Sequence, residues 1–196
     1  VMTEGTRLDP WFDSYSERSR HMKASAIRAL FAVANRPEVV SLAGGMPFLD
    51  GLPLDHIADT SARLIREHGT VALQYGSGQG EPVMREHMCE IMSLEGIRAH
   101  ADDVVVTTGS QQALDLVTRI IIDPGDVVIA EAPSYVGALG VFNAAQAEVV
   151  HVPMDDDGLI PEELDKTLTR LASEGARAKF IYTIPNFHNP GGMSLS

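Results

Sequence analysis

The sequence contains one cysteine, Cys89, among its 196 residues. An internal disulfide needs two cysteines, and a low cysteine content is typical of proteins that work in a reducing compartment. We therefore expect a cytoplasmic protein in which Cys89 fills space in the core. Its neighbours at helical spacing are apolar, namely Met84, Met88 and Met92.

Basic residues are also few. Fifteen Lys and Arg stand against 27 Asp and Glu, giving a net charge of -12, which argues against a nucleic-acid-binding surface. No apolar run approaches the roughly 20 residues that span a bilayer, and the acidic N-terminal residues do not form a signal-peptide pattern. With 44% hydrophobic residues, the sequence predicts a globular protein without nucleic-acid or membrane partners.

From Asp102 onward, apolar strand-like runs alternate with helical patterns. Buried strands are predicted at 104–108, 127–131, 147–152 and 178–184, and helices at 110–122, 134–145 and 161–173. Alternating β and α units predict a mainly parallel sheet covered by helices, the α/β class. The acidic run at 155–157 is interpreted as a solvated turn, because its spacing lacks the ligand pattern of a calcium loop.

The region before Asp102 is predicted to be helical. A helix is expected at 54–68, with Ile57, Ala58, Ala62 and Ile65 buried, and another at 82–94. The glycine-rich loop between them does not fit the G-x-G-x-x-G dinucleotide pattern, because position 81 is Glu. This disfavours an NAD-dependent dehydrogenase and leaves a loop that presents Tyr75.

Polar and aromatic residues follow three of the predicted strands. In an open α/β sheet, ligands bind outside the carboxyl ends of the strands. Gly109, Ser110 and Gln111 open a helix, whose free N–H groups and dipole favour a phosphate. Alone, this turn also occurs in domains that bind nothing. Tyr135 and Asn189 follow the other strands, so a flat, phosphorylated aromatic cofactor would use all three positions.

Five motifs, in this order, resemble those of the fold-type I, class I/II aminotransferases that depend on pyridoxal phosphate (PLP). The sequence is most similar to the 2-aminoadipate and multi-substrate branch of that family. The resemblance implies a three-layer α/β/α PLP-transferase large domain with a mainly parallel sheet, preceded by an N-terminal arm and helix. The motifs are Ser41-Leu42-Ala43-Gly44-Gly45-Met46-Pro47, Leu73-Gln74-Tyr75-Gly76, Thr108-Gly109-Ser110-Gln111-Gln112-Ala113-Leu114, Glu131-Ala132-Pro133-Ser134-Tyr135 and Pro185-Asn186-Phe187-His188-Asn189-Pro190-Gly191-Gly192.

The resemblance implies a role for each matching position in binding PLP. The phosphate would be held by Gly109, Ser110 and Gln111. Tyr135 would stack on the pyridine ring, and Asn189 would donate to the phenolic oxygen of the ring. In a homodimer, Tyr75 would reach the phosphate in the partner's site.

The resemblance also implies a substrate side and a domain division. Ser25 and Arg28, on an N-terminal helix, would contact the amino-acid or 2-oxo-acid substrate, and Gly45 would line its site. Arg28 suits a carboxylate because its planar guanidinium binds in a bidentate manner. Residues 1–50 are predicted to form the arm, this helix and the Gly-Gly motif, and residues 51–196 the start of the PLP-binding domain. The Ala132-Pro133 and Asn189-Pro190 bonds are expected to be cis.

Two positions depart from the family's pattern. Gly191 stands where the family usually has threonine, and Ser196 is the last residue, before the family's ring-pairing Asp, Schiff-base lysine and carboxylate-binding arginine. Lys23, Lys166 and Lys179, the only lysines, do not fit the Schiff-base position. We therefore expect no catalytic residue in this chain, a lysine beyond Ser196, a missing C-terminal part of the fold, and no transamination by these residues alone.

The function predicted from the resemblance is transfer of an amino group between an α-amino acid and a 2-oxo acid. Two alternatives remain. Another fold-type I PLP enzyme, a lyase or an oxidase, would use the same cofactor site. A PLP-binding sensor domain of a transcription regulator would also match, and would be expected to carry a basic winged helix-turn-helix upstream.

Overall fold

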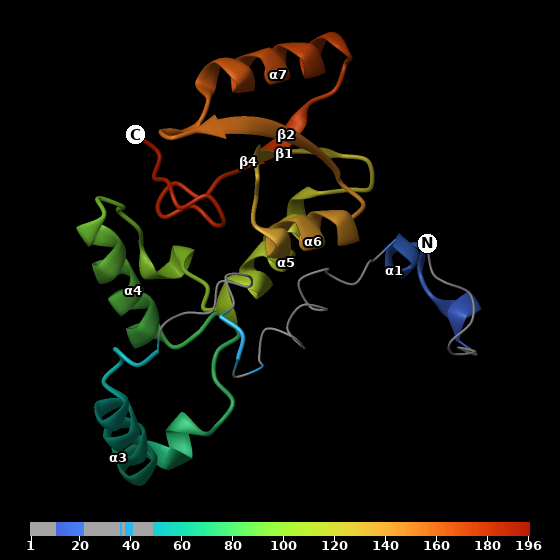
Figure 1. Cartoon of the computed structure of the whole chain (residues 1–196). Coiled ribbons are helices and arrows are strands. Elements are labelled where there is room, and N and C mark those ends of the chain that lie inside the picture. Colours follow the sequence, from blue (N-terminus) through green and yellow to red (C-terminus); the bar gives the residue numbers. More distant parts are fainter. Residues whose placement is uncertain (1–10, 22–35, 37, 41–48) are drawn as a thin grey trace. The chain divides into compact units, whose positions relative to one another are not determined.

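The computed structural model describes residues 11–21, 36, 38–40 and 49–196 (Figure 1). The chain divides into two compact units. The sheet unit comprises Gln111–Ser196 with Val1–Gly45, and the helical unit comprises Met46–Ser110. Ser25, Arg28, Gly45 and the helix predicted around them lie outside the described residues. Within the described N-terminal stretch are a short 3-10 helix η1 (Phe12–Ser14) and α1 (Glu17–His21).

The sheet unit is built on a four-stranded sheet with the order β3-β2-β1-β4. Strand β1 pairs in parallel with both β2 and β4, and the short β3 pairs antiparallel with β2. The predicted mainly parallel sheet is therefore confirmed, and only β3 was not foreseen. The strands are β1 (Val127–Ala132), β2 (Glu148–Asp155), β3 (Gly158–Leu159) and β4 (Ala178–Tyr182).

Helices cover both faces of this sheet, as predicted for a three-layer fold. Helix α7 (Pro161–Ser173) lies on one face, and α5 (Gly109–Ile121) and α6 (Val136–Ala144) lie toward the other (Figure 1). One core cluster contains Val128 and Phe142, and the other contains Ile129 and Leu171. Because β1 has a neighbour on each side and a layer on each face, its apolar run Val127–Ala130 is buried throughout.

The helical unit contains α3 (Leu54–Ala72), α4 (Pro82–Leu94) and the 3-10 helix η2 (Ala101–Asp103). Helix α4 has its predicted bounds, whereas α3 runs on past a non-helical His68 (φ -133°, ψ 19°). The prediction that α3 buries Ile57 and Ile65 is wrong, since Ile57 is 47% exposed, Ile65 is 52% exposed, and no residue of α3 is buried. The helix has an apolar stripe, but the described residues do not cover it.

The prediction of a buried strand at 104–108 is also wrong. These residues have no regular secondary structure, and Val105 is 55% exposed. The β-branched run favours an extended backbone, as at Val104 (φ -105°, ψ 130°), but a strand also needs a neighbouring strand to complete its hydrogen-bond ladder. Gln79 supplies part of that ladder instead. Its backbone carbonyl accepts from the Val106 N–H (2.8 Å), and its Nε2 donates to the Val104 carbonyl (3.0 Å).

The peptide bonds Ala132-Pro133 and Asn189-Pro190 are both cis, as expected. The acidic run at 155–157 forms a turn in which the Asp157 N–H donates to Oδ1 of Asp155 (2.8 Å). Among the described helices, none is both long and apolar enough to cross a membrane.

Candidate functional site

The sheet unit brings three predicted site residues to segments that flank the carboxyl ends of β1 and β4. These strands are parallel neighbours, so the chain leaves both at the same sheet edge. Tyr135 follows β1 and immediately precedes α6, and Asn189 lies in the loop that follows β4. Gln111 lies in the first turn of α5.

Gln111 and Tyr135 are linked through Gly137. The Gln111 side chain donates from Nε2 to the Gly137 carbonyl at 3.2 Å. The Tyr135 ring lies over Gly137 so closely that a Cβ there would be 2.5 Å from its Cε1 and Cζ atoms. Glycine is thus required at position 137 for the ring to lie where it does, and the Gln111 amide bonds to the backbone of the same residue.

Helix α5 begins as an anion-binding helix would. Gly109 has a positive φ of 72°. Its N–H donates to the Thr107 carbonyl (2.9 Å), and its own carbonyl accepts from the Thr107 hydroxyl (3.0 Å). The first turn contains no acidic residue, and Ser110 and Gln111 are exposed there. The helix dipole and the N-terminal N–H groups of this 13-residue helix therefore face no opposing carboxylate from its own first turn.

A buried carboxylate at the end of β1 was missed by the sequence reasoning. Glu131 is 2% exposed, and its two oxygens accept from the Thr183 hydroxyl (2.6 Å) and the Ile184 N–H (3.0 Å). Nε2 of His188, a residue 3% exposed, lies 3.1 Å from Glu131 Oε2. The signal was a glutamate ending an otherwise apolar buried strand, which requires donors nearby. These bonds also explain why β4 ends at Tyr182 rather than at the predicted residue 184.

Two tyrosines and this carboxylate form the electrostatic surroundings of the sheet edge. Burial raises the pKa of Tyr182 above its ordinary value of 10.0, and the neighbouring Tyr135 and Glu131 raise it further. Ionisation of Tyr182 is disfavoured because it would place a second negative charge near Glu131. The raised pKa therefore keeps the Tyr182 phenol neutral at physiological pH.

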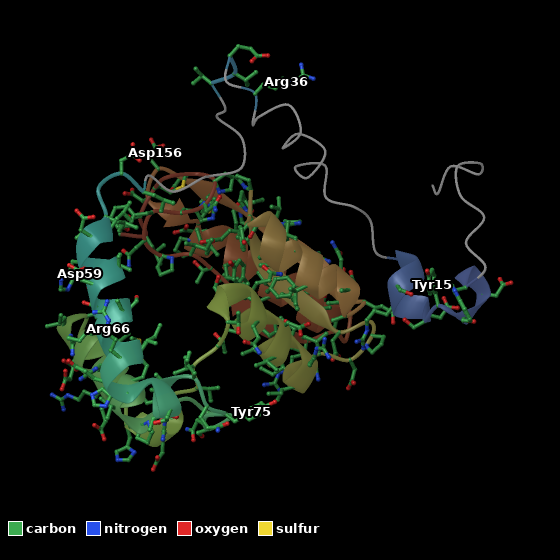
Figure 2. The ribbon with its side chains drawn as sticks, turned by 90° about the horizontal axis from the view of Figure 1, so that it is seen from below. Tyr15, Arg36, Asp59, Arg66, Tyr75 and Asp156 are labelled. Carbon is green, nitrogen blue, oxygen red and sulfur yellow. The ribbon has the colours of Figure 1, made fainter. Side chains whose placement is uncertain are left out.

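Tyr75 belongs to the helical unit, in the loop after α3, and is 99% exposed (Figure 2). Gly109 and Ser110 are counted with the helical unit but are the first residues of α5, which continues into the sheet unit at Gln111. Of the predicted site residues, the structure directly links Gln111 with Tyr135 and places Asn189 after the neighbouring strand. The assembly of all of them around one ligand remains a prediction.

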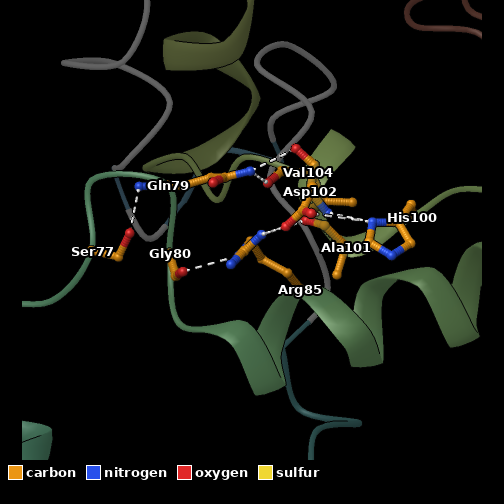
Figure 3. A network of polar contacts seen from close by, with 8 residues as sticks. All are labelled: Ser77, Gln79, Gly80, Arg85, His100, Ala101, Asp102 and Val104. Carbon is orange, nitrogen blue, oxygen red and sulfur yellow. Dashed lines mark hydrogen bonds and ion pairs between the residues drawn. The ribbon is translucent and has the colours of Figure 1, made fainter.

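Gln79 and Arg85 hold the segment that leads to α5 (Figure 3). Arg85 is 8% exposed and donates from Nε to the Gly80 carbonyl (3.1 Å) and from Nη1 to the Ala101 carbonyl (2.6 Å). Gln79 Nε2 bonds to the Asp102 carbonyl as well as to that of Val104. Neither residue was predicted to matter, because the sequence alone does not show which carbonyls a loop glutamine reaches.

The two described lysines pair with carboxylates on the surface. Lys166 Nζ lies 2.6 Å from Glu163 Oε1 within α7, which raises its pKa, and Lys179 Nζ lies 3.2 Å from Asp126 Oδ2. Lys23 lies outside the described residues. Within the part of the chain that the structure describes, no group of three or more metal-binding side chains occurs.

The residues present have the chemistry to bind a flat phosphorylated ring. In the sheet unit, the Tyr135 ring can offer its face to an aromatic ligand, and the exposed Asn189 offers an amide. At the start of α5, the dipole and N–H groups suit a phosphate. Each part separately fits the group that the sequence resemblance implies.

Comparison with known proteins identifies related sequences and folds. The family model for aminotransferase class I and II matches residues 37–196. Aromatic-amino-acid aminotransferase 1 of Thermococcus litoralis is 39% identical over 93% of the chain, which covers 44% of that protein. A solved structure of alpha-aminoadipate aminotransferase from Thermus thermophilus, complexed with N-(5'-phosphopyridoxyl)-L-leucine, is also similar. Its sequence is 35% identical and its TM-score is 0.81, and the match covers 95% of this chain and 44% of that chain.

A protein described as a transcriptional regulator is also similar. The uncharacterized HTH-type transcriptional regulator YisV of Bacillus subtilis is 27% identical over 100% of the chain, which covers 39% of the regulator. The chain thus spans less than half the length of each of these relatives.

Proposed function

The chain belongs to the aminotransferase class I and II family, and from this membership we propose that it is the N-terminal portion of a PLP-dependent aminotransferase. The longer protein would move an amino group between an α-amino acid and a 2-oxo acid. The Schiff-base lysine would lie beyond Ser196, so residues 1–196 alone would not transaminate. The alternative of a fold-type I lyase or oxidase predicts the same cofactor site and differs in the product formed.

One observation carries this proposal. Tyr135, Gln111 and the loop that holds Asn189 belong to one compact unit, with Tyr135 and Asn189 following neighbouring parallel strands. The tie between Gln111 and Gly137 couples the start of α5 to the residue beneath the Tyr135 ring. Such an arrangement supports a site that takes a phosphate and a ring together.

We assign the chain's residues the following roles. Backbone N–H groups of Gly109, Ser110 and Gln111, with the Ser110 hydroxyl, bind the phosphate. Tyr135 orients the ring by stacking, and Asn189 donates a hydrogen bond to the ring's phenolic oxygen. When bound, PLP supplies an electron sink for a bond broken at the substrate α-carbon.

Two further proposals concern the partner and the substrate. The 99% exposure of Tyr75 supports a homodimer in which it reaches the partner's phosphate site. Ser25, Arg28 and Gly45 would contact the substrate. Arg28→Ala is expected to raise the KM for acidic substrates more than for apolar ones, measured in the full-length protein. Equal increases would contradict a role for Arg28 in selectivity.

The direct test is addition of PLP to the full-length protein. We expect a new visible absorption band that shifts when an amino-acid substrate is added. Asn189→Ala should change the wavelength or pH dependence of this band, because the hydrogen bond to the phenolic oxygen is lost. Asn143→Ala, at an exposed position of α6, is the matched control and should have no effect. Absence of any band in the unaltered protein would refute the proposal.

A PLP-binding sensor domain is the second candidate, and the similarity to YisV favours it. Both candidates predict cofactor absorption, but only an enzyme turns over. Formation of a 2-oxo acid from an amino acid, with a second 2-oxo acid as acceptor, would decide for the aminotransferase. A spectral response to amino acids without product would decide for the sensor.

Location and domain division complete the proposal. The single cysteine supports a cytoplasmic location, which cell fractionation would test. We also retain the division into residues 1–50, carrying the substrate helix, and residues 51–196, beginning the PLP-binding domain. Deletion of residues 1–50 should then spare PLP binding and impair substrate binding.

A further inference from the structure

The loop after β4 closes around a buried histidine. His188 is 3% exposed, while Asn189 beside it is exposed. The backbone of His188 is bonded on both sides, since its N–H donates to the Met193 carbonyl (2.8 Å) and its carbonyl accepts from the Gly192 N–H (2.6 Å). The Leu195 N–H donates to the Pro185 carbonyl (2.7 Å) and closes the loop at its base.

The His188 ring joins this loop to the sheet. Nδ1 accepts from the Gly191 N–H at 3.0 Å, so in this arrangement Nδ1 carries no proton. The other ring nitrogen, Nε2, lies 3.1 Å from Glu131 Oε2, within ion-pair distance but without the alignment of a hydrogen bond, and it has no other partner among the described residues. Asn189 therefore stands between two residues, His188 and Gly191, that are held together by one imidazole nitrogen.

Glu131 in turn is fixed by the chain that leaves β4. The Thr183 hydroxyl and the Ile184 N–H donate to its two oxygens. A buried carboxyl group with fixed donors has few alternative positions, because leaving them would bury its oxygens without hydrogen-bond partners. The His188 ring thus lies against a fixed side chain at the end of β1, and β1 is also the strand that leads to Tyr135.

We propose that His188, which bonds to the Gly191 N–H and lies against Glu131, is the positioning residue that sets where the Asn189 side chain meets a ligand at this sheet edge. The inference rests on the proposed function, in which that ligand is PLP. It goes further because it makes the orientation of the Asn189 side chain depend on His188 and Glu131, two buried residues that need not touch the cofactor. A role in stability alone would leave the cofactor's spectrum unchanged in any variant that still folds.

The test compares two substitutions at His188 in the full-length protein. His188→Leu removes both ring contacts, whereas His188→Gln offers an amide oxygen to Gly191 and an amide N–H to Glu131. We expect His188→Leu to reproduce the spectral change of Asn189→Ala and to weaken PLP binding about five- to tenfold, the effect of one lost hydrogen bond. His188→Gln should restore the wild-type spectrum. His87→Leu, at an exposed position of α4, is the control.

Combining the substitutions shows whether the two residues act together. The double variant His188→Leu/Asn189→Ala should show no greater spectral change than Asn189→Ala, because Asn189 carries the effect of His188. Additive changes, or a wild-type spectrum in His188→Leu beside an altered one in Asn189→Ala, would overturn the inference and leave the proposed function standing. Absence of a PLP band in the wild type would refute both the inference and the proposed function.

A second variant keeps the inference testable if His188→Leu does not fold. Glu131→Gln preserves the side chain's shape but replaces one acceptor oxygen with a donor, which opposes the donors around it. It should shift the PLP band in the direction seen for Asn189→Ala. A folded Glu131→Gln protein with an unchanged band would contradict the inference.

Discussion

At the scale of single residues, the position of the Tyr135 ring depends on an absent side chain. Gly137→Ala would place a methyl group 2.5 Å from two ring carbons, so the ring must move. We expect PLP affinity to fall about two- to tenfold, the range of one aromatic contact, as measured by titration in the full-length protein.

The control for this substitution lies in the same helix. Gly140 is exposed, and a Cβ there would meet no atom within 4 Å. Gly140→Ala should leave PLP affinity unchanged and raise the free energy of unfolding by up to about 1 kcal/mol, because alanine favours helix. Equal affinities for the two variants would contradict the role given to Gly137.

Tyr182 gives a prediction about pH. Its pKa is raised in the folded state, chiefly by burial, so the unfolded chain loses this proton first as the pH rises. The contribution of Tyr182 to the free energy of unfolding is therefore fully present below about pH 10 and lost above it. Tyr182→Phe should remove the latest phase in an ultraviolet titration of phenolate formation. Persistence of that phase in Tyr182→Phe would contradict the assignment.

The site residues that the sequence indicated act in a different way from those that it missed. Ser110, Tyr135 and Asn189 stand in motifs with a family resemblance, so they could be selected from sequence alone. Glu131 and His188 stand in the same motifs, but their pairing joins residues far apart in the chain. Gly137 was missed because its importance is a close approach of a ring, which no local pattern encodes.

At the scale of elements, one arginine holds the segment between α4 and α5. Arg85→Lys replaces a fork that reaches two carbonyls with a single ammonium, leaving one carbonyl without its donor. We expect the free energy of unfolding to fall by about 1–3 kcal/mol, measured by urea denaturation.

A surface arginine offers the comparison. Arg63 forms an exposed pair with Glu67 on α3 at 3.3 Å. Arg63→Lys should change the free energy of unfolding by less than about 0.5 kcal/mol, because exposed pairs contribute little. A loss in Arg63→Lys as large as in Arg85→Lys would mean that burial of the Arg85 contacts is unimportant.

Element prediction succeeded where periodicity was sufficient. Helices α4 and α7 have their predicted bounds, since proline marks the start of each and apolar spacing continues to the end. It failed at 104–108, where the residue types favour extended backbone but a glutamine side chain replaces the neighbouring strand. It failed also for the burial of α3, because an apolar stripe does not specify what covers it.

At the scale of the whole molecule, burial is concentrated in one strand. Val128, Ile129 and Ala130 of β1 are fully buried, whereas α3 has no buried residue. We expect amide hydrogen exchange in the 196-residue chain to be slowest in β1 and fast in α3, because opening β1 requires loss of the sheet. Equal protection of the two would contradict this distribution of stability.

The fold class and family could be predicted because they depend on the order of many elements and motifs. The alternation of strands and helices after residue 102 predicted the parallel sheet, and the observed strand order places Tyr135 and Asn189 after adjacent strands. The division into units did not follow from sequence, since it depends on contacts between segments far apart.

The loop that carries Asn189 also has an oxidation-sensitive packing contact. Gly191 lacks the side chain that the family usually has there, and the Met193 thioether occupies the space where a Cβ would stand. Conversion of Met193 to its sulfoxide adds a polar oxygen to the sulfur that packs against Gly191. The backbone carbonyl of Met193 accepts from the His188 N–H, so a shift of Met193 would reach His188 as well. Mild peroxide treatment should therefore weaken PLP binding in the wild type, and Met193→Leu should be resistant. The binding site would then respond to oxidants although no cysteine lies near it in the sequence.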